Sequence, residues 1–107
     1  MSDPLRGPGP VHGFWSTTSA SSVIEITCVE RPDFLCFDAQ HGHDLDQLTT
    51  TMFTALAGSG VAGIVRVAVN DSNEIGRALD LGASGVMVPM VNNAAEAQSA
   101  VRAFKYA

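Results

Sequence analysis

Short apolar runs alternate along this chain with longer segments of helical periodicity. Four runs of about five residues are rich in β-branched and aromatic side chains, which is typical of strands buried on both faces. They cover residues 11–15, 34–38, 63–67 and 85–89. Their last residues are spaced by 23, 29 and 22 positions, close to the length of one strand-plus-helix unit. The pattern therefore predicts four such units in succession.

Three of the intervening segments begin with a residue that can cap a helix and have Gln or Glu three positions later. Apolar residues then recur at helical spacing, so we expect one face of each helix to pack against a core. The pairs are Asp44 with Gln47, Asp71 with Glu74, and Asn93 with Glu96. The apolar positions are Leu45, Leu48, Met52 and Leu56, then Ile75, Ala78 and Leu79, then Ala97, Val101 and Phe104.

The remaining helical segment and the helix ends are marked by small residues and proline. A serine-rich stretch from about Ser19 predicts a first helix that ends before Pro32. Gly58 and Gly82 are predicted helix stops, since glycine commonly follows the last helical residue.

Strand followed by helix, four times over, implies an α/β fold with a parallel sheet and right-handed crossovers. Two closures fit the pattern: an open doubly wound sheet, or half of a (β/α)8 TIM barrel. Residues 1–10 contain three prolines and two glycines and are expected to form a flexible N-terminal arm. The chain stops where a fifth strand is due, so we expect residues 11–107 to be the N-terminal half of a barrel and a fragment of a larger chain.

The amino-acid composition argues against some classes of binding partner and indicates a cellular compartment. Six Lys and Arg against eleven Asp and Glu give a net charge of −5 and a pI near 4.8, which argues against nucleic acid or an anionic membrane as partner. No apolar run approaches the ~18 residues of a membrane span, and the first ten residues lack the apolar region of a signal peptide. A cytoplasmic location is therefore expected, with Cys28 and Cys36 as buried thiols rather than a disulfide.

Polar side chains gather where the predicted strands end, which is the edge that carries function in both closures. Arg66 stands inside an apolar run, where a buried charge needs a partner. It therefore reads as the binding residue for a small anion, or else as an arginine paired with a neighbouring acid for structure. The other residues at this edge are Trp15, Asp38, Gln40, His41, His43, Pro89 and Met90.

His41 follows Asp38 by three residues, so the carboxylate could orient the imidazole and fix its tautomer, as a general base requires. A histidine in such a loop is otherwise merely a polar surface residue. His43 completes a His-Gly-His spacing that metal-dependent hydrolases also use, which leaves a hydrolase based on both histidines as a further interpretation.

Four segments, in order, resemble the HpcH/HpaI aldolase family, the metal-dependent class II pyruvate aldolases. They are Phe-Asp-Ala-Gln-His-Gly at 37–42, Val-Arg-Val at 65–67 with Asn-Asp at 70–71, Ala-Leu-Asp-Leu-Gly-Ala at 78–83, and Gly-Val-Met-Val-Pro-Met-Val at 85–91. The resemblance runs from about Gly13 to Tyr106. It implies a (β/α)8 barrel of about twice this length and a homo-oligomer.

By motif, the resemblance implies that His41 is the catalytic base and that Asp38 and Asp80 are acids associated with it. It implies that Arg66 binds pyruvate, and that a divalent metal (Mg2+, Mn2+ or Co2+) chelates the enolate in the complete enzyme. The assignment of Asp80 rests on the resemblance alone. Gln40 departs from the pattern, because many members have glutamate there. The metal-ligating Glu and Asp of the family fall beyond Ala107, so no metal ligand is assigned to this chain.

The expected function is that of a carbon–carbon lyase, which cleaves a 4-hydroxy-2-oxo acid to pyruvate and an aldehyde. We expect this truncated chain to be inactive by itself. The alternative is a non-catalytic half barrel that functions only by self-association or by binding a partner.

Overall fold

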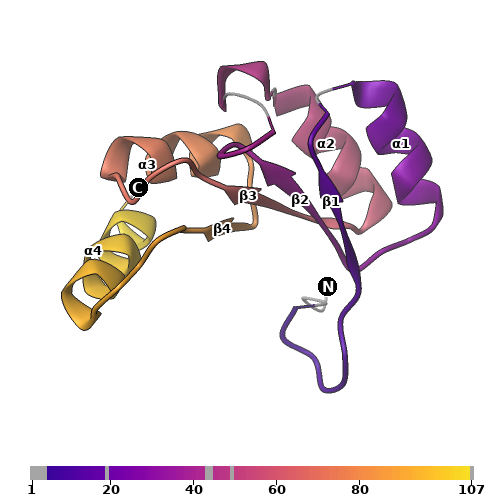
Figure 1. The fold of residues 1–107 in the computed structure, drawn as a ribbon. Coiled ribbons are helices and arrows are strands. Elements are labelled where there is room, and N and C mark those ends of the chain that lie inside the picture. The colour runs from indigo at the N-terminus through magenta and orange to yellow at the C-terminus, as the bar shows by residue number, and fades with distance from the viewer. Residues whose placement is uncertain (1–4, 19, 43–44, 49, 107) are drawn as a thin grey trace.

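Four parallel strands lie side by side in the order of the sequence. The computed structural model describes residues 5–18, 20–42, 45–48 and 50–106. Its single sheet has the order β1-β2-β3-β4 (Figure 1). The strands are β1 (Gly13–Ser16), β2 (Phe34–Asp38), β3 (Ala62–Arg66) and β4 (Gly85–Met87). The prediction of four parallel strands is confirmed, with each strand end within two residues of its predicted position.

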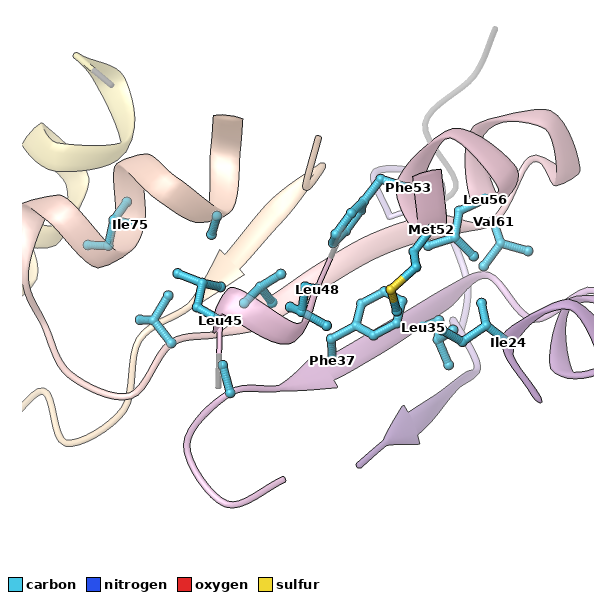
Figure 2. Close-up of a cluster of buried hydrophobic side chains, with 14 residues drawn as sticks. Ile24, Leu35, Phe37, Leu45, Leu48, Met52, Phe53, Leu56, Val61 and Ile75 are labelled. Atoms are coloured by element: carbon cyan, nitrogen blue, oxygen red, sulfur yellow. The ribbon is translucent and has the colours of Figure 1, made fainter. Parts of the chain in front are cut away.

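The helices between the strands pack on one face of this sheet. They are α1 (Ser21–Val29), α2 (Thr50–Ser59), α3 (Ser72–Leu81) and α4 (Ala94–Lys105), and a short 3-10 helix, η1 (Leu45–Gln47), precedes α2. Side chains from α1, α2 and α3 join Leu35, Phe37 and Val65 of the strands in one buried cluster (Figure 2). A sequential strand order with helices on one face matches a barrel segment. A doubly wound sheet reverses its strand order and carries helices on both faces, so that closure is excluded.

The segment between β2 and β3 buries the predicted apolar positions, but not on one helix. Leu45, Leu48, Met52 and Leu56 are all at most 5% exposed. Leu45 lies in η1, Leu48 directly follows it, and Met52 and Leu56 lie in α2, so the single helix predicted from Asp44 onward is wrong. A run of β-branched threonines at 49–51 lowers helix propensity between the two elements. The predicted cap Asp44 itself lies outside the described residues.

The helix ends follow the predicted capping chemistry in part. The backbone N–H of Glu96 donates to Oδ1 of Asn93 at 2.9 Å, which confirms Asn93 as the cap of α4. The Glu96 carboxylate accepts in return from Asn93 Nδ2 at 3.2 Å and from the backbone N–H of Asn92 at 3.0 Å. Gly82 ends α3 with a φ of +114°, as predicted. The predicted stop at Gly58 is wrong, because α2 continues through it and Gly60 takes the positive φ of +79°.

The apolar face predicted for α4 is exposed, unlike the apolar positions predicted for α2 and α3. Val101 is 63% and Phe104 46% exposed, and α4 contacts the cluster only through Ala100 and Ala103. An apolar hollow of about 330 Å³ opens between β4, α3 and α4. The prediction that this face is buried is therefore wrong for this chain, because none of the elements in the described ranges covers it.

The sequence also predicts a flexible N-terminal arm, two free thiols and no membrane-spanning segment. Residues 1–4 of the predicted arm lie outside the described residues, whereas residues 6–10 are exposed and carry neither helix nor strand. Cys28 and Cys36 are both free thiols, and Cys36 is fully buried as predicted, whereas Cys28 is only half-buried. No helix in the described part of the chain is long and apolar enough to cross a membrane.

Two glycines of the same helix segment should respond oppositely to a methyl group. Gly82→Ala places a side chain at φ +114° with its Cβ 3.1 Å from Cβ of Phe53, and should lower the free energy of unfolding by about 1–2 kcal/mol. Gly76→Ala meets nothing within 4 Å inside α3 and should raise it by about 0.5–1 kcal/mol. Urea unfolding followed by circular dichroism checks both, and a neutral Gly82→Ala contradicts the strained helix end.

Candidate functional site

Three side chains from three neighbouring strands meet at the carboxyl edge of the sheet. Asp38 is the last residue of β2 and pairs in register with Arg66, the last residue of β3. Trp15 of β1 pairs with Cys36, two residues before Asp38. Paired residues share a face, and so do residues two apart along a strand. All three functional side chains therefore lie on the face of the sheet opposite the helices.

The Asp38 carboxylate is buried and receives five hydrogen bonds. Its Oδ1 accepts from the backbone N–H groups of Gln40 at 2.9 Å and His41 at 3.0 Å, and from Arg66 Nε at 3.1 Å. Its Oδ2 accepts from Trp15 Nε1 at 3.0 Å and from Arg66 Nη2 at 2.6 Å. Only 2% of Asp38 is exposed, so the carboxylate itself is shielded from water.

This shell of donors decides the charge of Asp38. Burial alone would raise the pKa of the carboxyl group. Against it, the hydrogen bonds from Arg66, from the His41 backbone, from Trp15 and from the Gln40 backbone hold that pKa well below its usual range. Asp38 is therefore a carboxylate at neutral pH, and it has no proton to give.

Arg66 is held on one edge and on one face. Its Nε and Nη2 grip Asp38 side-on, and its Cζ lies 4.9 Å from the centroid of the Trp15 ring, within the range of a cation–π contact. The side chain is 22% exposed, and no hydrogen bond engages its Nη1 within the described ranges. The structural pairing that the sequence left open is thus present, and one edge of the guanidinium remains available for an anion.

The ring of His41 does not take the partner that the spacing predicted. Asp38 accepts a bond from the backbone N–H of His41, not from its imidazole, because an aspartate at the end of a strand closes a tight turn on the amides two and three residues later. His41 is exposed at the start of the loop that follows β2. His43, the second histidine of the predicted His-Gly-His pattern, lies outside the described residues.

Asp80 does not join the other predicted site residues within this chain. It is exposed in the last turn of α3, and that helix runs back from the carboxyl edge. Just beyond it, the backbone N–H of Ser84 donates to Gly63 O near the amino end of β3, at 2.7 Å. Asp80 instead borders a hollow of about 310 Å³ between η1 and α3, where Arg77 pairs with Asp46. Its role in catalysis stays a prediction.

Sequence reasoning placed Trp15 at this edge but gave it no role in the site. The signal was available, because Trp15 ends the first apolar run as Asp38 ends the second. What the sequence lacked was the register that directs its indole N–H at Asp38.

Cys36 of β2 lies on the same face of the sheet as Asp38, opposite the helices, and its thiol is unreactive. Burial, with the negative charge of Asp38, raises the pKa of Cys36 to about 11. The thiol therefore stays protonated at neutral pH and is a poor nucleophile and a poor metal ligand.

No group of three or more His, Cys, Asp or Glu side chains lies together as a metal site in the ranges that the structure describes. The described residues therefore do not by themselves form a site for the divalent ion that the resemblance implies.

The sequence was compared with protein families and with named relatives. The family model "HpcH/HpaI aldolase/citrate lyase" matches residues 12–107. A 4-hydroxy-2-oxo-heptane-1,7-dioate aldolase of Escherichia coli is 35% identical over 102 residues, which are 95% of this chain and 39% of that protein. The enzyme of the same name from Salmonella dublin is 34% identical over 104 residues, 97% of this chain and 40% of that protein. The chain thus spans about two fifths of the length of these relatives.

Members of the same family are also found among the solved structures that align with this chain. A HpcH/HpaI aldolase/citrate lyase family protein from Burkholderia cenocepacia J2315 aligns with a TM-score of 0.81 and 28% identity, over 94% of this chain and 40% of that one. The HpcH/HpaI aldolase from Desulfitobacterium hafniense DCB-2 aligns with a TM-score of 0.79 and 26% identity, over 90% and 38%. These neighbours are TIM-barrel proteins, which confirms the expected fold class. The chain belongs to the HpcH/HpaI aldolase/citrate lyase family.

Proposed function

We propose that this chain supplies the first four strand–helix units of a carbon–carbon lyase. The complete enzyme cleaves a 4-hydroxy-2-oxo acid to pyruvate and an aldehyde through an enolate. The observation that carries the proposal is the guanidinium of Arg66, fixed on one edge by Asp38 and open at Nη1, at the edge of the sheet where barrel enzymes bind substrate. Family membership and the names of the relatives support the same class of reaction.

The chemistry needs a base and a cation. The hydroxyl at C4 loses its proton, the C3–C4 bond breaks to release the aldehyde, and the bonding electrons move to the C2 oxygen as an enolate that is then protonated at C3. His41 is the proposed base, exposed on the loop that Asp38 anchors through the His41 backbone N–H. Arg66 stabilises the negative charge that develops on the substrate oxygens. Asp80 is proposed as an acid of the same reaction on the family motif alone.

A divalent ion, when bound, stabilises the charge of an enolate. We propose that the complete enzyme uses Mg2+, Mn2+ or Co2+, with ligands in the part of the protein that corresponds to the later strands of the relatives. A small 2-oxo acid as substrate, a homo-oligomeric state and a cytoplasmic location belong to the same proposal.

A second candidate function is a non-catalytic half barrel that works by association. Large apolar side chains on α1 and α4 favour it, because Ile26 and Val29 are 69% and 76% exposed, and Val101 is 63% exposed. Such surfaces mark contact with another polypeptide. The behaviour of the isolated chain and of the complete enzyme separates the two candidates.

The two histidines should differ in an enzyme completed with the remaining residues of the Escherichia coli aldolase. His41→Ala should lower kcat by roughly 100-fold or more, as expected for loss of a positioned base, whereas His43→Ala should stay within a few-fold. Steady-state pyruvate release measures both. If His43→Ala instead removes bound metal and activity while His41→Ala is mild, the site is that of a metal-dependent hydrolase.

Arg66→Lys should be damaging although it keeps the charge. A single ammonium group cannot hold both oxygens of Asp38 and still present a free edge to substrate. We expect kcat/KM to fall by about 100-fold or more. Arg77→Lys is the matched control, because that arginine pairs with Asp46 on the outer surface, and it should stay within twofold. Equal effects of the two substitutions would contradict the anion-binding role.

The 107-residue chain alone should release no pyruvate from a 4-hydroxy-2-oxo acid with Mg2+ or Mn2+. It should also self-associate, because β1 and β4 each have an unpaired edge. Coupled pyruvate assays and sedimentation velocity test these outcomes. An active chain, or a monomer at all concentrations with a cooperative melt, would count against the half-barrel interpretation.

A further inference from the structure

We propose that Asp38 is a positioning residue that acts through Arg66 and through the backbone of the His41 loop, and that Trp15 completes this arrangement. The inference rests on the proposed function and changes the role of one residue in it. By motif, Asp38 is an acid that serves the histidine side chain. The contacts assign it to the orientation of the guanidinium and to the position of the loop.

The first argument is how the donors to Asp38 are distributed. They come from β1 through Trp15, from β3 through Arg66, and from the loop after β2 through two backbone amides. One buried carboxylate therefore links three separate segments of the carboxyl edge. If its charge is removed, the side chains of Trp15 and Arg66 and the start of the His41 loop all lose their common acceptor.

The second argument is the geometry of Arg66. A guanidinium has five N–H donors in one plane. The side-on pair with Asp38 uses Nε and one hydrogen of Nη2, so Nη1 and the other hydrogen of Nη2 remain. These form the end-on edge, which can give two parallel bonds to the oxygens of a 2-oxo acid. Asp38 thus determines which edge the substrate meets.

The third argument is the double contact of Trp15. Its Nε1 donates to Asp38 Oδ2 at 3.0 Å, and its ring lies 4.9 Å from Cζ of Arg66. The indole therefore restrains the acceptor and the face of the guanidinium together. A phenylalanine in its place keeps the aromatic face and loses the donor, which separates these two contributions.

Kinetics of the completed enzyme give the first test. Asp38→Asn should raise KM for the 2-oxo acid at least tenfold and lower kcat, while the apparent pKa of the base in the pH profile of kcat/KM stays where it is. Trp15→Phe should raise KM a few-fold with the same pH profile. Asp33→Asn is the matched control, because this carboxylate also accepts a backbone N–H, from His12 at 2.8 Å, but next to the opposite edge of the sheet. It should leave KM within twofold.

An acid that tunes the imidazole behaves differently. In that case Asp38→Asn moves the apparent pKa of the base and leaves KM unchanged, and this outcome overturns the proposal.

Fluorescence gives a test that needs no activity. Trp15 is the only tryptophan, so the emission of the 107-residue chain reports on this cluster alone. Asp38→Asn and Arg66→Gln should each shift the emission and at least double its quenching by acrylamide, and Asp33→Asn should do neither. If Asp38→Asn leaves emission and quenching unchanged, the positioning role fails. If the fluorescence responds while the completed enzyme has no lyase activity, the proposed function fails and the link between these residues stands.

Discussion

The ion pair of Asp38 with Arg66 is the interaction on which the carboxyl edge of this sheet depends. A buried carboxylate is unfavourable unless donors surround it, and here one arginine, one indole and two amides do so. The pair exists because β2 and β3 are parallel and in a register that sets their last residues side by side. The strand register thereby determines the geometry of the site, and the charge of Asp38 fixes the orientation of the Arg66 guanidinium.

Much of the fold follows from local pattern. β2 could be predicted to the residue because Phe34, Leu35 and Phe37 form a dense apolar run, and the Asn93 cap gave the start of α4. The break between η1 and α2 could not, because burial at helical spacing is satisfied by two short helices as well as by one. Nor could the exposure of Val101, since amphipathicity identifies an apolar face but not the element that covers it.

The candidate site, like the fold, could be predicted from the sequence only in part. The carboxyl ends of parallel strands share an edge, so the sequence alone could bring Trp15, Asp38 and Arg66 together. The sequence could not say which atoms meet. A spacing of three residues is compatible with a hydrogen bond to Asp38 from either the ring or the backbone of His41, and the structure has the backbone bond. Asp80 shows the limit of a motif, which carries a residue type across a family without its position. In this chain the direction of α3 carries that carboxylate away from the carboxyl edge.

The sequential order of the strands also bears on how the chain reaches its fold. Each strand pairs with the one that precedes it, after a crossover of a few tens of residues, so every ladder closes a short loop of chain. Contacts of low sequence separation favour rapid folding. No strand of this sheet is separated from its partner by a strand that is made later in the chain. In the order of synthesis the aspartate of the second unit precedes the arginine of the third, so the Asp38 carboxylate is without its arginine until β3 has been made.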